Sequence, residues 1–124
     1  MRESDRLTEF VIGSAIEVRK RLGCGLLERA YHTCLCIELE KRNLTFKSQL
    51  GLPIVYDGHR VDVAYRPDLI VDERLIVELK TVTALAAAHK AQILTYLRLS
   101  GIKVGLLINF HAVPFTSGIK RFVM

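Results

Sequence analysis

The stretch Pro67–Lys80, with the sequence PDLIVDERLIVELK, decides the fold because two apolar runs flank the charged triplet Asp72–Arg74. Two short apolar runs separated by a charged turn predict a β-hairpin. A hairpin centred on Glu73 places Asp68 directly opposite Glu78. That register requires a three-residue loop or a bulge, because a two-residue loop would put the two carboxylates on opposite faces.

Charged residues interrupt an otherwise apolar strand at the end of this hairpin. Alternate side chains of a strand share a face, so Glu78 and Lys80 point the same way and Leu79 points to the opposite, buried face. Buried strands rarely hold an unpaired Glu. Asp68 and Glu78 together would form an oxygen-rich site of the kind that Mg²⁺ prefers, with a lysine beside it for a phosphate or a water. The alternative is an ordinary amphipathic hairpin with charges at its solvent end.

Length and composition are those of one globular domain spanning residues 1–124, with 50% hydrophobic and 25% charged residues. The chain has neither an apolar run long enough to cross a bilayer nor a signal peptide, so we expect a cytoplasmic protein without membrane contacts. A net charge of +5 suits a polyanionic partner. Cys24, Cys34 and Cys36 fit no disulfide framework or metal cluster, and small core residues are the simpler interpretation.

Periodicity and turn signals predict an α/β fold. We expect helices over residues 4–22, 26–42 and 85–100, and strands over 45–49, 52–56, 60–65, the Pro67–Val82 hairpin, 103–110 and the tail 118–124. The strand–helix–strand order after the hairpin implies a right-handed crossover and parallel pairing. The expected architecture is a mixed sheet of about four or more strands flanked by helices.

A third acidic residue lies in the first turn of the second expected helix. Gly25, Glu28 and Tyr31 follow one another at three-residue spacing and share a helix face. Glu28 is therefore a candidate metal ligand or water-orienting group. The alternative is a first-turn Glu that complements the helix dipole.

Polar residues also line one face of the third expected helix, at His89, Gln92 and Tyr96. Because this helix follows the Lys80 strand directly, Gln92 and Tyr96 could orient a water or hold a phosphate. The alternative is the polar edge of an amphipathic helix. The two interpretations are balanced for Gln92, packing is favoured for Tyr96, and His89 is expected at the rim.

Together these residues resemble the GxxExxY proteins, a prokaryotic family within the PD-(D/E)XK nuclease superfamily. The resemblance covers nearly the whole chain through segments Ile12–Val18, Gly25–Tyr31, Leu39–Arg42, Tyr65–Leu69, Val77–Lys80, Ala91–Leu97, Gly105–Phe110 and Gly118–Arg121. It implies a restriction-endonuclease-like core.

The resemblance also implies roles for the residues around the hairpin. Asp68 and Glu78 would hold Mg²⁺ or Mn²⁺, helped by the main-chain carbonyl of Leu79. Lys80 would position or polarise the attacking water, and Glu28 would be the helix-borne acidic partner.

Gln92 with Tyr96 resembles a helical Gln-x-x-x-Tyr element of several nuclease lineages, whereas three positions depart from the family pattern. Arg19 replaces a usual His, Cys24 a usual Pro, and His111 a frequent Asn. Arg19 could grip a phosphate instead, or the activity could be weakened. The candidate substrate contacts are Arg19, Tyr31, His89 and Tyr96.

The resulting hypothesis is a metal-dependent nuclease that hydrolyses phosphodiester bonds with metal-activated water, on DNA in preference to RNA. A chain this short has no visible recognition module, so a homodimer or a partner protein would supply substrate choice. The alternative is a catalytically inactive nuclease-fold module that binds nucleic acid or a partner protein. A cysteine-based redox or metal module is disfavoured.

Overall fold

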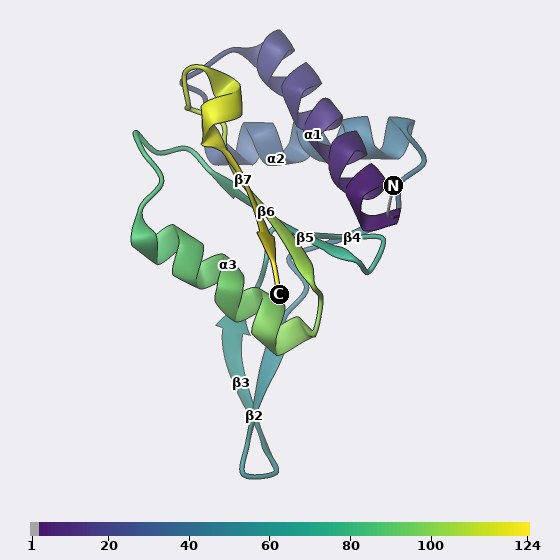
Figure 1. Ribbon diagram of the computed structural model, residues 1–124, viewed down its shortest axis with the longest axis vertical. Helices are drawn as coiled ribbons and strands as arrows, with labels where there is room; N and C mark the ends of the chain where they lie inside the picture. Colours follow the sequence, from purple (N-terminus) through teal and green to yellow (C-terminus); the bar gives the residue numbers. More distant parts are fainter. Residues whose placement is uncertain (1–2) are drawn as a thin grey trace.

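The computed structural model describes residues 3–124 (Figure 1). Its helices are α1 (Glu3–Leu22), α2 (Glu28–Lys41), α3 (Ala87–Ser100) and the short 3-10 helix η1 (Phe115–Gly118). Its strands are β1 (Phe46–Ser48), β2 (Leu52–Tyr56), β3 (His59–Tyr65), β4 (Leu69–Val71), β5 (Leu75–Lys80), β6 (Val104–Asn109) and β7 (Ile119–Val123). The helices and strands expected from the sequence are all present, with boundaries shifted by a few residues.

A five-stranded mixed sheet in the order β1-β4-β5-β6-β7 forms the centre of the molecule. Strands β5 and β6 pair in parallel, as the strand–helix–strand pattern predicts, and the other neighbouring pairs are antiparallel. The tail adds β7 as an edge strand beside β6. The expected fold class, a mixed sheet flanked by helices, is therefore confirmed.

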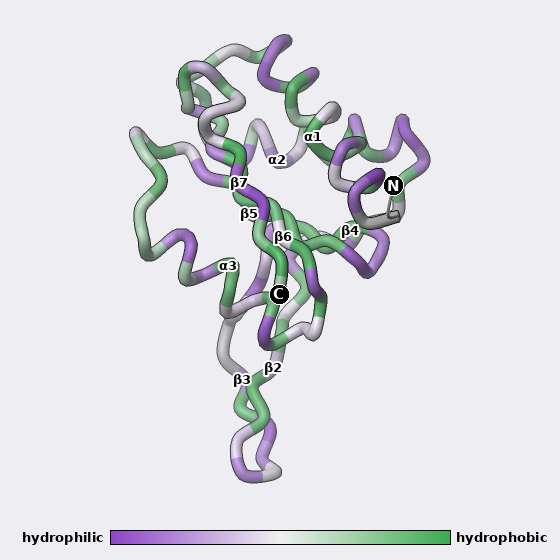
Figure 2. The backbone as a smooth tube through the Cα atoms, in the orientation of Figure 1, coloured by the Kyte–Doolittle hydropathy of each residue, from purple (hydrophilic) through white to green (hydrophobic). Residues whose placement is uncertain are grey.

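Helices cover both faces of this sheet, with α1 and α2 on one side and α3 on the other (Figure 1). Leu69, Val77 and Leu79 face the layer of α1 and α2, whereas Ile70 and Ile76 face α3. Figure 2 shows that hydrophobic residues concentrate on the central strands. Within residues 3–124 no helix has the length and apolar character needed to span a bilayer.

The β4–β5 hairpin has the register that a meeting of Asp68 and Glu78 requires. Leu69 pairs with Val77 and Val71 with Leu75, so a three-residue loop is centred on Glu73. The main-chain N–H of Arg74 donates to the Val71 carbonyl oxygen at 3.0 Å and closes this loop. Continuing the register toward the open end sets Asp68 opposite Glu78, on the face that α3 covers.

Strands β2 and β3 form a separate two-stranded ribbon, which projects from the body of the molecule (Figure 1). The sequence predicts both strands, but it does not predict that the pair leaves the main sheet. Its base packs on α3 through Leu52, while the side chain of Tyr56 near the tip is 74% exposed. The register shifts next to Pro53, which has no N–H to donate to a ladder.

Candidate active site

Two buried carboxylates meet at the open end of the β4–β5 hairpin. The main-chain N–H of Asp68 donates to Oε1 of Glu78 at 2.9 Å, and the N–H of Leu79 donates to Oδ2 of Asp68 at 2.7 Å. Asp68 is 9% exposed and Glu78 is 4% exposed. Because each carboxylate accepts a hydrogen bond from the backbone of the opposite strand, both side chains are held in fixed orientations.

Gln49 supports Asp68 from the position directly after the edge strand β1. Its Nε2 donates to Oδ1 of Asp68 at 3.2 Å, and its main-chain N–H donates to the Asp68 carbonyl oxygen at 3.2 Å. The sequence predicts a strand over residues 45–49 and indicates no role for Gln49, whereas β1 ends at Ser48. Ser48 pairs with Leu69, so one further step along the two antiparallel strands brings Gln49 opposite Asp68. Knowledge of this strand pairing would have identified the contact.

Lys80 provides the positive charge of the site. Its Nζ lies 3.5 Å from Oε2 of Glu78, and its side chain is 18% exposed. Both residues belong to β5 and point to the same face, as alternation along the strand predicts. The ammonium is therefore fixed beside the carboxylates and still reaches solvent.

The electrostatics of the pair favour an extra positive charge. Burial, and then the charge of Asp68, raise the pKa of Glu78 to about 8, although the Asp68 N–H and Lys80 oppose the shift. A carboxyl with that pKa holds a proton at neutral pH when no other cation is present. A perturbed carboxyl of this kind is typical of functional sites.

Gln92 and Tyr96 approach the carboxylates from α3. Nε2 of Gln92 donates to the Tyr96 hydroxyl oxygen at 3.1 Å. Burial, followed by the negative charges of Glu78 and Asp68, raises the pKa of Tyr96 to about 12. The structure therefore brings this pair of residues to the acidic site, and Tyr96 also packs in the core beneath α3.

Glu28 comes to the same site from the opposite layer, as the first residue of α2. Burial and the charge of Asp68 raise the pKa of Glu28, whereas Lys80 lowers it. No three His, Cys, Asp or Glu side chains in residues 3–124 converge closely enough to hold a metal ion by themselves. Glu28 therefore lies near the Asp68–Glu78 pair without completing a three-carboxylate cluster.

The donor set of the pair nevertheless fits a hard cation. Each oxygen of Asp68 and Glu78 contacts one protein donor, from Gln49, Leu79, the Asp68 N–H or Lys80. An ionised carboxylate has about four lone-pair positions, so each oxygen keeps acceptor capacity. Mg²⁺ commonly binds one or two carboxylates and completes its shell with water and substrate oxygens.

Tyr31 lies in the core rather than at the solvent side of the site. Its side chain is buried, and its ring stacks on Phe110 with 4.6 Å between the ring centroids. The hydroxyl donates to the Gly23 carbonyl oxygen at 2.7 Å and accepts from the Leu26 N–H at 3.2 Å. In this position Tyr31 holds the loop that leads into α2.

Arg19 and His89 also have structural partners. The Arg19 guanidinium lies over the Phe115 ring, 5.5 Å from its centroid, and in residues 3–124 no ion pair joins it to Asp68 or Glu78. The Nδ1 atom of His89 accepts a hydrogen bond from the Ala86 N–H at 2.9 Å, which caps the start of α3.

Asn109 is a buried polar residue that sequence reasoning missed. Its Oδ1 accepts from the N–H groups of Val82 and His111, at 3.1 and 3.2 Å, and its Nδ2 donates to the Val82 carbonyl oxygen at 2.8 Å. Asn109 is also the register partner of Lys80 across β5 and β6. It therefore fixes the chain that leaves the Lys80 end of β5. The available signal was an Asn at the end of an otherwise apolar strand.

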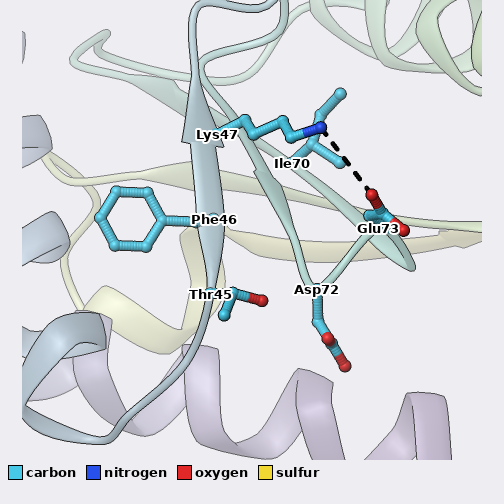
Figure 3. A pocket seen from close by; sticks show the side chains of 6 residues that line it. All are labelled: Thr45, Phe46, Lys47, Ile70, Asp72 and Glu73. Carbon is cyan, nitrogen blue, oxygen red and sulfur yellow. Dashed lines mark ion pairs between the residues drawn. The ribbon is translucent and has the colours of Figure 1, made fainter.

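Figure 3 shows a hollow at the opposite, turn end of the same hairpin. It has a volume of about 230 Å³ and is lined by Thr45, Phe46, Lys47, Ile70, Asp72 and Glu73. Nζ of Lys47 lies 3.8 Å from Oε1 of Glu73, and both side chains are largely exposed. The pair is an ordinary surface ion pair, which distinguishes this hollow from the buried carboxylate site.

The fold and the paired carboxylates define a nuclease-like α/β domain, and comparison with known families agrees. The family model of the PD-(D/E)XK nuclease superfamily matches residues 5–122. The chain therefore belongs to the PD-(D/E)XK nuclease superfamily. Comparisons with curated proteins and with solved structures each find no match.

Proposed function

We propose that the chain hydrolyses phosphodiester bonds in nucleic acid, in DNA by preference, with Mg²⁺ or Mn²⁺ held by Asp68 and Glu78. The observation that carries this proposal is the reciprocal hydrogen bonding of the two buried carboxylates, with the Lys80 ammonium 3.5 Å from Glu78. Membership of the nuclease superfamily supports the same reaction class. Within that superfamily we assign the chain to the GxxExxY proteins.

Charge balance at the site supports a divalent ion. The ionised pair with the Lys80 ammonium carries one net negative charge. Burial first, and then the negative charge of Asp68, raise the pKa of Glu78 to about 8. A bound divalent cation would make the site net positive, as a phosphodiester requires. The ion would supply charge stabilisation on the phosphate oxygens and would activate a water.

The protein residues have separate tasks in this proposal. Asp68 and Glu78, with the main-chain carbonyl of Leu79, supply oxygen ligands. Lys80 orients the attacking water or neutralises a phosphate oxygen, which requires an ammonium fixed in place before the substrate arrives. Gln92 orients water or phosphate from α3, and Glu28 assists from the start of α2. Tyr96 holds Gln92 through their hydrogen bond.

Cleavage assays test the proposal directly. Single-stranded, nicked, branched and supercoiled DNA, and an RNA of matched sequence, would be incubated with the wild type in EDTA, Mg²⁺ or Mn²⁺. Lys80→Ala would be compared with Lys47→Ala, which removes the same charge at the turn end of the hairpin. We expect metal-dependent cutting that is lost only in Lys80→Ala.

Equal cutting by wild type and Lys80→Ala would overturn the assignment of the site. Absence of cutting on every substrate and with every metal, by protein with a native circular-dichroism spectrum, would overturn the nuclease function. It would instead favour a binding module that does not cut.

A further inference from the structure

A basic hollow of about 290 Å³ lies on the α3 side of the molecule, next to the ends of β5 and β6. Its lining includes Thr83 from the loop after β5, Lys90 of α3, Asn109 at the end of β6, and Lys120 of β7. Ligands of open α/β sheets commonly bind beyond the carboxyl ends of parallel strands, and β5 and β6 end here.

The charges around this hollow are of one sign. Lys90 and Lys120 are both exposed, and in residues 3–124 neither forms an ion pair. None of the residues that line the hollow is Asp or Glu. By contrast, Lys41, Lys47 and Lys80 each lie within 4.0 Å of a carboxylate oxygen. Uncompensated ammonium groups around one concave surface attract anions.

Strand register places Lys120 on the same face as the proposed catalytic residues. Lys120 is the partner of Leu107, and directly opposed residues of an antiparallel pair point to the same side. Leu107 packs against α3, so Lys120 also points to the α3 side. Glu78 is the parallel partner of Leu107 on that same face.

The hollow is also adjacent to the carboxylate site. Asn109 lines it and is the register partner of Lys80, and neighbouring strands lie about 4.8 Å apart. A polymer with regularly spaced phosphates that reaches Lys80 can therefore place a neighbouring phosphate in this hollow. A small anion would make no such second interaction.

The walls of the hollow are rigid. Asn109 holds the main chain at Val82 through hydrogen bonds of 2.8 and 3.1 Å, one residue before Thr83. A Cβ added at Gly118 would overlap the Cβ of Ala112 and lie 2.9 Å from the Asn109 carbonyl oxygen, so only glycine permits this close packing. Lys90 and Lys120 belong to α3 and β7, so both lysines project from regular secondary structure.

We propose that this hollow binds a phosphate group of the nucleic-acid strand beside the phosphate at Lys80. Lys90 and Lys120 supply the positive charges and the Thr83 hydroxyl supplies a hydrogen-bond donor. The inference rests on the proposed function for its substrate class. It adds a second anchoring point that holds the strand in register with the carboxylates.

Binding in EDTA tests this phosphate site without requiring cleavage. Fluorescence anisotropy of a short labelled single-stranded oligodeoxynucleotide would be measured with the wild type, with Lys90→Ala/Lys120→Ala, and with the control Lys20→Ala/Lys103→Ala. The control removes the same charge from exposed positions outside the hollow. We expect roughly tenfold weaker binding only in the first variant. We also expect a salt-dependence slope smaller by about 1.4 in that variant, because each lysine that no longer neutralises a phosphate lowers the slope by about 0.7.

Equal weakening in the two double variants would overturn the phosphate site, because the effect would then follow net charge alone. Unchanged binding in Lys90→Ala/Lys120→Ala would overturn it as well, as would a wild type that does not bind the oligonucleotide. Failure of the cleavage assay leaves this binding result interpretable, so the two proposals fail separately.

Oligonucleotides with and without a 5′-phosphate show whether the hollow binds a terminal phosphate or an internal phosphodiester. A wild type that prefers a 5′-phosphorylated over a 5′-hydroxyl strand, with the preference abolished in Lys90→Ala/Lys120→Ala, would identify a terminal phosphate as the ligand. Equal affinity for both strands, with the same tenfold weakening in the variant, would identify an internal phosphodiester.

Discussion

The two ends of the β4–β5 hairpin carry similar charged residues in different settings. At the open end, Asp68 and Glu78 are buried and accept main-chain hydrogen bonds from each other's strands. At the turn, Asp72 and Glu73 are exposed, and Glu73 forms only a surface ion pair at 3.8 Å. Residue type is therefore a poor guide to chemistry here, and burial with a fixed orientation distinguishes the two ends.

The largest effect is expected when one carboxylate charge is removed at the open end of the hairpin, with the same change at the turn end as the control. Asp68→Asn should lower the metal-dependent cleavage rate on the order of a hundredfold to a thousandfold, as loss of a preorganised electrostatic group does. Asp72→Asn should cut at the wild-type rate. Initial rates on one DNA substrate at fixed Mg²⁺ measure the difference, and similar rates for both variants would erase the functional contrast between the two ends.

The second prediction concerns stability and pH. The pKa of Glu78 is raised to about 8 in the folded protein, above the usual value of 4.5. Between these pH values the folded state holds a proton that the unfolded state releases, so the free energy of unfolding falls as pH rises and the penalty is complete above about pH 8. Glu78→Gln removes this penalty.

In EDTA, Glu78→Gln should therefore be more stable than the wild type at pH 9, on the order of a few kcal/mol, with little difference at pH 5. Glu73→Gln is the matched control and should change stability by less than about 1 kcal/mol at either pH. Urea unfolding at both pH values measures this. If Glu78→Gln is less stable than the wild type at pH 9, the ionised Glu78 carboxylate does not destabilise the folded state.

A third prediction uses the metal itself. A ligand that binds only the folded state adds about 2.7 kcal/mol at one hundred times its Kd. Mn²⁺ should therefore raise the Tm of the wild type and of Asp72→Asn, but not that of Asp68→Asn. Differential scanning fluorimetry across an Mn²⁺ titration reports the shifts. An equal shift in all three proteins would place the ion elsewhere.

The smallest effect is expected at the turn. Glu73 adopts a left-handed backbone conformation with φ of 57°, which glycine tolerates better than glutamate. Glu73→Gly should stabilise the hairpin by about 0.5 kcal/mol and leave cleavage unchanged. Thermal unfolding and the cleavage rate, measured on the same preparation, test both statements. A slower rate would mean that the turn is coupled to the open end.

The sequence predicts the open end of the hairpin well because side chains along a strand alternate between its two faces. Apolar runs on either side of Glu73 predict the hairpin, and the three-residue loop that the structure shows sets Asp68 opposite Glu78. Local periodicity in α3 likewise predicts that Gln92 and Tyr96 lie together. These residues are close in sequence, or share one regular element, so no long-range information is needed.

Gln49 could not be found in the same way. Its contact with Asp68 depends on how β1 pairs with β4. The whole β2–β3 ribbon separates these two strands in the sequence, although they are neighbours in the sheet. Tyr31 is a candidate substrate contact from its place on the helix face. Its partners are Gly23, in the loop before α2, and Phe110, in the turn directly after β6. Side-chain roles that depend on nonlocal packing are not encoded in periodicity.

The β2–β3 ribbon leaves and rejoins the main sheet at adjacent points, since the Gln49 N–H donates to the Asp68 carbonyl oxygen at 3.2 Å. The intervening residues 50–67 form an insertion whose two ends lie next to each other beside the carboxylates. Insertions or exchanges at its exposed tip would leave the sheet register intact. The ribbon is therefore a position where evolution or a protein engineer can add residues without rebuilding the Asp68–Glu78 carboxylate pair.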